Sequence, residues 1–458
     1  MTVTAELLGS LGGIFADRMS VADAVREHHS HGESYHPPAP PDVVVYPKTT
    51  EEVSAIARLC SAHRTPMVPF GAGTSLEGHV SALAGGVCID LSEMNRILRV
   101  SPEDLDATVE AGVTRKQLTE ELKASGLTFF LDPGADASIG GMVATGASGT
   151  TAVRYGTIRD NVLGLTVVLA TGEVIRTGGR ARKSSAGYDL TRLMIGSEGT
   201  LGIVTEITLK LQPLPDAISA ASCSFPTLAA AVDTVIAAIQ LGIPVARAEL
   251  LDERSMDALE RFSKLGYPIQ PTLFFEFHGA SDASVAEQAQ AMKEIAAEQG
   301  GGDFRWATTL EERTKLWHAR HEMANASLML RPGCKGWATD VCVPISKLAE
   351  CIRETRIDND SSPLIGPILG HVGDGNFHCI YLLDPARPEE IAEAKRLNDR
   401  LVDRALALGG TCTGEHGIGY GKMASLAKEH GDLVPVMRAI KRALDPDGLL
   451  NPGKIFPM

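Results

Sequence analysis

Short apolar runs alternate with amphipathic segments between about residues 41 and 215. Residues 43–47 and 66–70 are expected strands, because they are short, apolar and bounded by turn residues. The helical spacing between them begins after Thr49 or Thr50, either of which suits an N-cap. This order of strand, helix and strand predicts a βαβ unit in the first half of the chain.

The pattern changes beyond Pro213 and Pro215, which mark an expected domain boundary. Long amphipathic helices are expected around residues 226–241, 283–299 and 388–408, with strands between them. This alternation predicts an α+β second domain with an antiparallel sheet. The expected organisation is a polar lead-in (1–40), a first domain (41–215), a second domain (216–420) and a C-terminal helix that returns to the first domain (421–458).

Composition and charge narrow the classes of partner. The 458-residue chain has a formal net charge of −14 and no long basic run, so nucleic acid is not an expected partner. Its best apolar stretch, residues 228–243, is interrupted by Asp233 and Gln240, which predicts peripheral membrane association at most. The start has no basic segment before an apolar core, and the eight cysteines form no C-x-x-C motif. These features favour a cytoplasmic location, at most at the inner face of a membrane.

Three glycine-rich segments occur at residues 71–78, 132–156 and 196–204. Glycine lets backbone N–H groups approach an anion closely, since no Cβ intervenes. The first segment is not a G-x-G-x-x-G fingerprint, because Leu76 stands where the third glycine is required, and it lacks the lysine of a P-loop. Taken alone, such a loop is more often only a turn. Three of them, enclosing almost no charge, predict a site for a large dinucleotide.

A second group of residues, His371, His378, Glu415 and His416, has metal-binding chemistry. Residues 373–376 (Gly-Asp-Gly-Asn) have turn composition, so a hairpin is expected to bring the first two imidazoles to neighbouring strands. Glu415 is the expected third ligand, because two histidines and one carboxylate leave open positions on a divalent ion. His416 would then remain available as a base. The alternative for the first two histidines is a solvated hairpin.

Longer ordered motifs in both halves resemble known flavoproteins. The first half is similar to the FAD-binding domain of vanillyl-alcohol-oxidase-like flavoproteins through PFGAGTSLEG (69–78), DPGA (132–135), VRYG (153–156), RDNV (159–162) and GSEGTLG (196–202). The second half resembles the metal-containing FAD-dependent D-2-hydroxyacid dehydrogenases through HVGDGNFH (371–378), GEHGIG (414–419) and NPGK (451–454). Within that group RPGCKG (331–336) and TDVCVP (339–344) support a narrower resemblance to the cytochrome-type D-lactate dehydrogenases. The resemblance implies an α+β protein with a two-subdomain FAD-binding domain and an α+β substrate, or cap, domain.

The resemblance also implies which residues contact FAD. The implied contacts are Phe70, Gly71, Ala72, Gly73, Thr74, Ser75, Gly78, Pro133, Gly134, Ser138, Gly141, Thr145, Gly199, Val204 and Asn451. Some relatives tether the flavin covalently through a histidine in the first glycine loop. Thr74 stands at the matching position here, so non-covalent FAD is expected.

Substrate-binding roles follow from the same resemblance. Trp317 and Arg320 match a Trp-x-x-Arg element, so Arg320 is expected to pair with the substrate carboxylate. Lys335 is the expected second cation, and Asn376 would hydrogen-bond the substrate. The alternatives are a helix-surface ion pair for the arginine and a solvated lysine. The implied reaction oxidises D-lactate or a related D-2-hydroxyacid to the 2-oxoacid: His416 takes the hydroxyl proton and flavin takes the hydride.

The implied metal site consists of His371, His378 and Glu415, and this donor set suits Zn²⁺, Mn²⁺ or Fe²⁺. A divalent ion there would make the substrate hydroxyl more acidic. Electrons are expected to pass to cytochrome c, a quinone-linked protein or an electron-transfer flavoprotein, and a homodimer is compatible with this reading. The alternatives are a D-2-hydroxyglutarate dehydrogenase, a glycolate oxidase FAD subunit and a non-redox flavoprotein synthase, because no motif reads the rest of the substrate.

Overall fold

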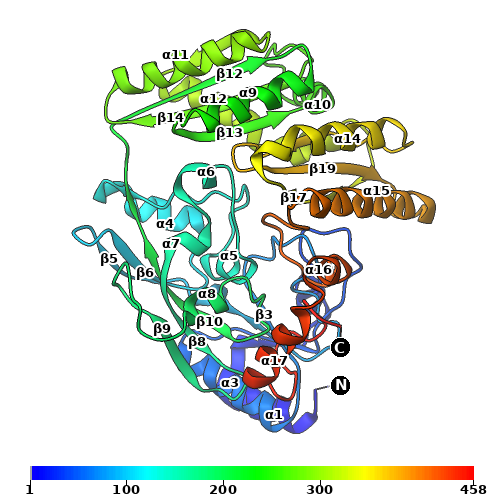
Figure 1. Cartoon of the computed structure of the whole chain (residues 1–458). Helices are drawn as coiled ribbons and strands as arrows, with labels where there is room; N and C mark the ends of the chain where they lie inside the picture. Colours follow the sequence, from blue (N-terminus) through cyan, green and yellow to red (C-terminus); the bar gives the residue numbers. More distant parts are fainter. Residues whose placement is uncertain (1–2, 458) are drawn as a thin grey trace. The chain divides into compact units, whose positions relative to one another are not determined.

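The computed structural model describes residues 3–457, which divide into two compact units. Unit 1 contains the described residues up to Ser148, Gly156–Leu214 and the residues from Glu415 onward. Unit 2 contains Gly149–Tyr155 and Pro215–Gly414. The chain therefore enters unit 2 twice and ends in unit 1, as the colours of Figure 1 allow the reader to follow.

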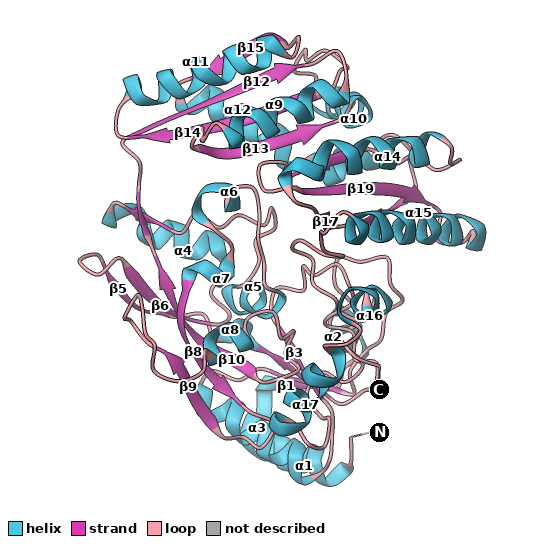
Figure 2. Ribbon diagram, viewed as in Figure 1, coloured by secondary structure: helices cyan, strands magenta, loops and turns pink. Residues whose placement is uncertain are grey.

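Unit 1 contains two larger sheets and one short strand pair, drawn in magenta in Figure 2. The four-stranded sheet has the order β1 (Met19–Ser20), β2 (Val43–Val45), β4 (Val87–Asp90) and β3 (Met67–Phe70). The five-stranded sheet has the order β5 (Ile97–Ser101), β6 (Asp106–Glu110), β10 (Ile203–Lys210), β8 (Val162–Val168) and β9 (Val174–Gly178). The short pair consists of β7 (Leu127–Thr128) and β11 (Gln212–Pro213).

The helix α3 (Thr50–Ala62) connects β2 to β3. Thr49 caps it, because its side-chain oxygen accepts the N–H of Glu52 at 3.2 Å. Its buried face includes Val53, Ile56 and Cys60, and burying such apolar side chains contributes roughly 1.5–3 kcal/mol each. Both β2 and β3 pair in parallel with β4. The predicted βαβ unit is therefore confirmed.

Residues 3–40 are packed into unit 1 and do not form the polar lead-in that we expected. The helix α1 (Ala5–Phe15) buries Leu7, Leu11 and Phe15, and β1 pairs with β2. His29 Nε2 lies 2.8 Å from Asp90 Oδ2, and both side chains are buried. Leu7, Leu11 and Phe15 recur every four residues, which places them on one helical face that packs into the core of unit 1.

The remaining helices of unit 1 connect its sheets and carry the end of the chain. They are α2 (Asp23–His28), α4 (Arg115–Leu122), α5 (Ile139–Thr145), α7 (Ile158–Asn161), α8 (Leu190–Met194), α16 (Met423–His430) and α17 (Val434–Leu444), with 3₁₀ turns at Ala16–Arg18, Leu91–Glu93 and Lys123–Ser125. After α17, Leu450 forms a parallel bridge with Met67, and this contact places Asn451 beside β3.

Unit 2 is built on one sheet of eight strands. Seven of them follow the order β15 (Gly302–Ala307), β12 (Ala217–Ser224), β14 (Thr272–Gly279), β13 (Val245–Leu251), β18 (Ile368–Gly370), β19 (Asn376–Leu383) and β16 (Lys335–Ala338), and β17 (Val341–Cys342) pairs with β19. Neighbouring strands pair in the antiparallel sense. The antiparallel sheet predicted for the second half is confirmed.

Helices pack against both faces of this sheet. Successive strand residues point to opposite faces, so each strand can supply contacts to both layers of helices. On one face Phe274 and Ile380 share a hydrophobic cluster with Met256 and Met323. On the other, Tyr381 of β19 donates a hydrogen bond to a residue of α14, and Figure 2 shows α14 and α15 beside β19. The helices of unit 2 are α6 (Ala152–Tyr155), α9 (Leu228–Gln240), α10 (Glu253–Ser263), α11 (Asp282–Glu298), α12 (Leu310–His321), α13 (Met323–Leu328), α14 (Leu348–Asp360) and α15 (Pro388–Ala407), with a 3₁₀ turn at Ile345–Lys347.

Within residues 3–457, no helix combines the length and the apolar character needed to cross a bilayer.

Candidate active site

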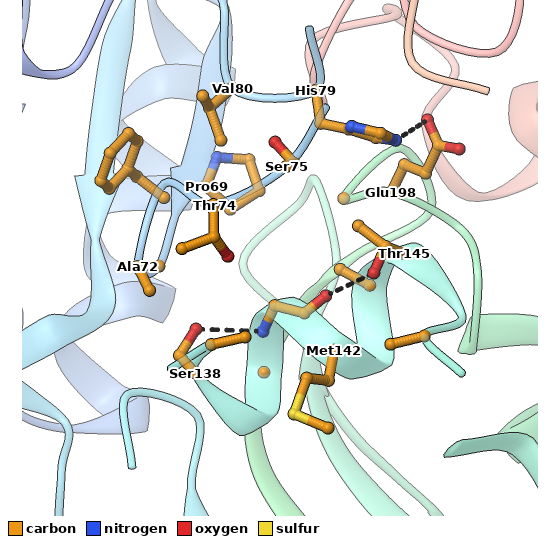
Figure 3. Close-up of a pocket in the computed structure, with 18 of the residues that line it drawn as sticks. Pro69, Ala72, Thr74, Ser75, His79, Val80, Ser138, Met142, Thr145 and Glu198 are labelled. Atoms are coloured by element: carbon orange, nitrogen blue, oxygen red, sulfur yellow. Dashed lines mark hydrogen bonds and ion pairs between the residues drawn. The ribbon is translucent and has the colours of Figure 1, made fainter. Parts of the chain in front are cut away.

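A large cavity in unit 1 is lined by the three glycine-rich segments (Figure 3). It contains about 1260 Å³ of empty space, including the part open to solvent. Its lining draws on all three segments, which suits an extended cofactor. The predicted FAD contacts that line it are Phe70, Gly71, Ala72, Gly73, Thr74, Ser75, Pro133, Ser138, Gly141, Thr145, Gly199, Val204 and Asn451.

Close packing between the loops explains why glycines are needed there. A Cβ on Gly71 would lie 2.3 Å from Ser138 Oγ, and a Cβ on Gly199 would lie 2.4 Å from Pro69 Cγ. Gly73 has a φ of +71°, a conformation that side chains with a Cβ disfavour. The loops can therefore surround the cavity this closely only because these positions have no side chain.

Ser138 and Thr145 fix the ends of α5 at the cavity wall. The Ser138 side chain accepts the N–H of Gly141 at 3.3 Å, and the Thr145 hydroxyl donates to the carbonyl of Gly141 at 3.1 Å (Figure 3). Both hydroxyl-bearing residues line the cavity. Their local hydrogen bonds hold the wall in place.

Two of the predicted FAD contacts, Gly78 and Gly134, are not among the lining residues. A Cβ on Gly78 would lie 2.2 Å from a ring carbon of Tyr420, so this glycine makes room for an aromatic side chain. Gly134 has a φ of +86° and open space around it. Its glycine is therefore explained by the turn that it makes.

Charge is scarce in the cavity lining. The residues described there include no lysine or arginine, and their ionisable side chains are those of His79, Glu198, Glu415 and His416. Backbone N–H groups of glycine loops can themselves bind phosphate oxygens. A neutral lining rich in glycine thus fits a dinucleotide whose pyrophosphate is bound by the backbone.

Two of these ionisable residues, His79 and Glu198, were not predicted as contacts. His79 Nε2 lies 3.4 Å from Glu198 Oε2, and both side chains are buried (Figure 3). Glu198 is the one charged residue of GSEGTLG. A single carboxylate inside a neutral glycine motif was a signal that sequence reasoning could have used.

The hairpin predicted around residues 373–376 is present in unit 2. β18 and β19 pair in the antiparallel sense, with Leu369 opposite His378, and the N–H of Asn376 donates to the carbonyl of His371. The ring centroids of His371 and His378 are 5.5 Å apart, at an interplanar angle of 81°. The turn therefore brings the two imidazoles together, as predicted.

Each of these imidazoles is oriented by an acceptor at Nδ1. His371 Nδ1 lies 2.7 Å from Glu249 Oε1, and His378 Nδ1 lies 2.9 Å from the carbonyl oxygen of Thr339. A carboxylate and a carbonyl can only accept, so each Nδ1 carries the proton and donates it. Nε2 is then the nitrogen with which each ring could coordinate a metal, as in metal sites where the other ring nitrogen donates to a carboxylate or carbonyl.

Arg320 of α12 belongs to the same group, because its Nη2 donates to Glu249 Oε2 at 2.6 Å. Burial raises the pKa of Glu249, but the charges of His371 and Arg320 and their hydrogen bonds outweigh it and bring the pKa below the ordinary value. Among the described residues, the buried Nε of Arg320 has no hydrogen-bond partner. A buried donor left without a partner suits an anionic ligand.

Asn376 extends this group through Asp340. Its Nδ2 donates to Asp340 Oδ1 at 2.7 Å and to the carbonyl of Val341 at 2.8 Å. Its buried Oδ1 accepts no hydrogen bond from the described chain. Glu249, Arg320, His371, Asn376 and His378 are together called the histidine cluster below.

The structure does not bring Lys335 to this cluster. Lys335 is exposed at the start of β16, where it pairs with Leu383. Leu383 lies five residues along β19 from His378, which corresponds to roughly 17 Å at about 3.3 Å per residue. Its substrate role stays a prediction.

Glu415 and His416 line the cavity of unit 1. His416 Nε2 lies 3.9 Å from Glu415 Oε1, and both side chains are largely buried. Of the three predicted metal ligands, His371 and His378 thus belong to unit 2 and Glu415 to unit 1. The ligand set as a whole stays a prediction.

Sequence reasoning also missed Glu249 and Asp340, the carboxylates beside the two histidines. Glu249 lies in the strand β13, whose other side chains are apolar except for Arg247. Asp340 precedes β17, and it also accepts a hydrogen bond from Thr413 at 2.6 Å. An isolated carboxylate in a buried strand requires a partner, and that requirement was the available signal.

Comparison with known protein families gives two matches. Residues 41–178 match the family described as "FAD binding domain", and residues 214–455 match "FAD linked oxidases, C-terminal domain". The second match alone covers more than half of the chain. The chain belongs to the FAD-linked oxidases.

Individual relatives agree with this family. The oxidase is 53% identical to "Probable D-lactate dehydrogenase, mitochondrial" of Danio rerio, over 96% of this chain and 89% of the relative. It is 47% identical to "D-lactate dehydrogenase [cytochrome], mitochondrial" of Arabidopsis thaliana, over 99% of this chain and 81% of the relative. Among solved structures it resembles p-cresol methylhydroxylase with substrate bound, with a TM-score of 0.80, 20% identity, and coverage of 99% of this chain and 97% of that one.

These findings confirm the expected fold, that of the vanillyl-alcohol-oxidase-like flavoproteins, and the expected enzyme class, the FAD-dependent oxidoreductases. FAD is therefore the cofactor of this oxidase. The names of the two relatives mention mitochondria. The cytoplasmic location stays a prediction for this chain.

Proposed function

We propose that this oxidase converts D-lactate, or a closely related D-2-hydroxyacid, to the 2-oxoacid. The observation that supports it best is the histidine cluster. There Glu249 accepts hydrogen bonds from both Arg320 and His371, and the buried Nε of Arg320 has no hydrogen-bond partner among the described residues. A cation beside potential metal ligands suits a substrate that presents a carboxylate and a neighbouring hydroxyl. The names of the relatives, which specify D-lactate, support the same substrate class.

In this proposal His371, His378 and Glu415 hold one divalent cation, which would be Zn²⁺, Mn²⁺ or Fe²⁺. The two imidazoles fit that role, because their Nδ1 atoms are already engaged by Glu249 and Thr339. A cation so held would supply positive charge that makes the substrate hydroxyl more acidic. Removing the metal should therefore slow the chemical step.

The remaining roles in substrate binding and proton transfer belong to individual residues of the chain. Arg320 binds the substrate carboxylate through Nε. Asn376 is the proposed hydrogen-bonding partner of the substrate. His416 takes the hydroxyl proton, since an imidazole with an unperturbed pKa of about 6.5 suits a general base near neutral pH. FAD, bound without a covalent link, supplies the acceptor for the two electrons and the hydrogen leaving Cα.

The proposal extends to the next electron acceptor. One relative is named for cytochrome, so cytochrome c is the first acceptor to test, before a quinone-linked protein or an electron-transfer flavoprotein. We expect association with a membrane to be peripheral at most, and the enzyme to act in the cytoplasm.

Anaerobic titration of the purified FAD-loaded protein tests the proposal. D-lactate should bleach the flavin absorbance, L-lactate should not, and D-2-hydroxyglutarate and glycolate should act more slowly. Chelation should slow the bleaching, added Zn²⁺ or Mn²⁺ should restore it, and Arg320→Met should raise KM for D-lactate. A flavin that D-lactate leaves oxidised, in protein shown to contain metal, would contradict the proposal.

A further inference from the structure

The segment that carries Glu415 and His416 is fastened to unit 1 by a buried carboxylate. Glu198 Oε1 accepts the N–H of Ile418 at 2.7 Å, and Glu198 Oε2 accepts the N–H of Gly419 at 2.8 Å. The side chain of Glu198 is buried. One carboxylate thus binds two consecutive backbone N–H groups, starting two residues after His416.

The backbone of Glu198 is itself fixed from two sides. Its N–H donates to the carbonyl of Ala144, and its carbonyl accepts the side-chain amide of Asn451 at 2.7 Å. Glu198 has a φ of +54°, and a side chain in this left-handed region costs on the order of 1–3 kcal/mol. Glycine would avoid that strain, so the strained glutamate indicates a role for its side chain.

The fit around the segment is too close for another side chain. Gly417 has a φ of +79°, and a Cβ there would lie 2.8 Å from His79 Nε2 and 2.9 Å from Glu198 Oε1. Figure 3 shows the side chains of His79 and Glu198 directed toward each other at the cavity. Neither ring nitrogen of His79 has a hydrogen-bond partner among the described residues. The side chains of His79 and Glu198 thus pack directly against the backbone at Gly417.

We propose that Glu198 is the positioning residue for His416: by binding the N–H groups of Ile418 and Gly419, it holds the 415–419 segment so that the imidazole faces the flavin cavity. This inference rests on the proposed function, because it takes His416 to be the base. Glu198 acts through the segment and does not itself touch the substrate. Its loss should therefore slow proton removal without weakening FAD binding to a similar degree.

The competing explanation is that Glu198 only satisfies two buried N–H groups. A buried donor left unsatisfied costs about 1–3 kcal/mol, so a stability change alone would not separate the two explanations. Proton removal belongs to the half-reaction in which substrate reduces the flavin. It takes no part in the later reoxidation by an acceptor, so a positioning role affects the two half-reactions unequally.

The first measurement is hydrogen exchange in Glu198→Gln, with and without FAD. A glutamine oxygen can accept one of the two N–H groups but its amide cannot accept the other, so exchange over residues 415–421 should rise about tenfold. Glu206→Gln is the matched control, because Glu206 is also in unit 1 and accepts from a threonine hydroxyl. Unchanged exchange in Glu198→Gln would overturn the inference without any measurement of activity.

The second measurement is stopped-flow kinetics of the FAD-loaded variants. Glu198→Gln should slow flavin reduction by D-lactate at least tenfold, while flavin reoxidation by a dye and the Kd for FAD stay within about threefold. Equal losses in both half-reactions would overturn the positioning role. If the glutamine variant does not fold, Glu198→Asp keeps the charge on a shorter arm and should show the same selective loss.

A double-mutant cycle separates this inference from the proposed function. If Glu198 acts through His416, Glu198→Gln should cause no further slowing in a His416→Ala background. A full additional loss in that background would overturn the inference and leave the base intact. A His416→Ala variant that reduces its flavin at the wild-type rate would instead overturn the proposed base, whatever Glu198 does.

Discussion

The flavin cavity and the histidine cluster are built in opposite ways. The cavity is lined by glycine loops together with apolar, hydroxyl and only four ionisable side chains, and the packing of Gly71 and Gly199 leaves no room for a Cβ. The cluster consists of ionised and polar side chains that are buried or, at His371, partly buried, and Glu249 at its centre pairs with both Arg320 and His371. The first is a shape made by the backbone, and the second is an arrangement of charges.

This difference predicts different sensitivities to substitution. A backbone-built cavity should tolerate changes of side-chain chemistry and fail when volume is added. A buried charge cluster should be damaged by the loss of one charge, because breaking a buried ion pair leaves the other charge uncompensated at a cost of about 3–5 kcal/mol. The variants below test this contrast, beginning with the largest expected effect.

Glu249→Gln should cause the largest loss. The amide oxygen can accept from Arg320 or from His371, and the amide N–H groups then face the other donor. Loss of such a partner of a metal-binding histidine lowers metal affinity or activity by about 10–100-fold, and the misplaced Arg320 should bring the fall in kcat/KM for D-lactate to about 10²–10³-fold. Metal content by elemental analysis and steady-state kinetics with a dye acceptor measure both effects.

Glu276→Gln is the matched control for this substitution. Glu276 is also a buried carboxylate, on the neighbouring strand β14, with Arg247 at 3.4 Å and His278 at 2.8 Å. It should lower the free energy of unfolding to a similar extent and leave metal content unchanged. The contrast between regions fails if the two variants lose the same amount of metal and of kcat/KM.

The features that the sequence revealed are those in which neighbouring residues act together. The Gly-Asp-Gly-Asn turn, the Thr49 cap and the glycine motifs each depend on a few consecutive positions, so residue type and spacing were enough. The hairpin brought His371 and His378 together as expected. Most of the cavity lining could be predicted as well, because it comes from three short segments of consecutive residues.

The features that escaped prediction depend on partners far apart in the chain. Glu249 pairs with Arg320, which is 71 residues away, and with His371, which is 122 residues away. Glu198 binds the N–H of Ile418, which is 220 residues away. The residues next to a carboxylate in the sequence do not show which distant residue it will pair with. The packed N-terminal segment was missed for a related reason, since its buried face becomes apparent only once a core is present.

Gly71→Ala tests the other side of the contrast. The added methyl would lie 2.3 Å from Ser138 Oγ, so the loop or the α5 cap must shift. We expect the Kd for FAD to rise about 10–100-fold, with little change in the metal content of the protein. Quenching of flavin fluorescence during FAD titration measures the Kd.

Gly179→Ala is the control for added volume, because nothing lies within 4 Å of a Cβ at Gly179, which is also in unit 1. Its Kd for FAD should remain within about threefold of wild type. A Gly71→Ala protein that binds FAD as tightly as this control would show that the cavity is not limited by backbone packing.

The smallest effect is expected at a buried cation that has no adjacent carboxylate comparable to Glu249. Lys454 Nζ donates to the carbonyl of Ser81 at 2.7 Å and to Asn451 Oδ1 at 3.3 Å. Burial lowers the pKa of Lys454 to about 8 from an ordinary 10.5, while the charge of Glu198 raises it only in part. The folded state therefore holds this proton less tightly than the unfolded state does.

The sign of the pH dependence follows from that order. Between pH 8 and 10.5 the unfolded chain binds more protons at this site, so the stability from Lys454 rises with pH, by at most about 1.4 kcal/mol per unit. This contribution is complete above pH 10.5 and is lost as the pH falls toward 8. The Lys454→Met variant should lack this rise, so the difference in the free energy of unfolding between wild type and variant should change with pH in this window. Urea unfolding of the FAD-loaded proteins measures that difference.

Lys441→Met is the control for Lys454→Met, because Lys441 has a carboxylate beside it and tests how such a partner changes the pH dependence of stability. Lys441 is a partly buried lysine of unit 1 whose pKa is also lowered by burial, but Asp445 beside it opposes that shift. Its substitution should change the slope of stability against pH less than Lys454→Met does. Equal slopes in the two variants would mean that a paired carboxylate does not decide how a buried cation is tolerated, and the contrast drawn between the cavity and the cluster would lose its electrostatic basis.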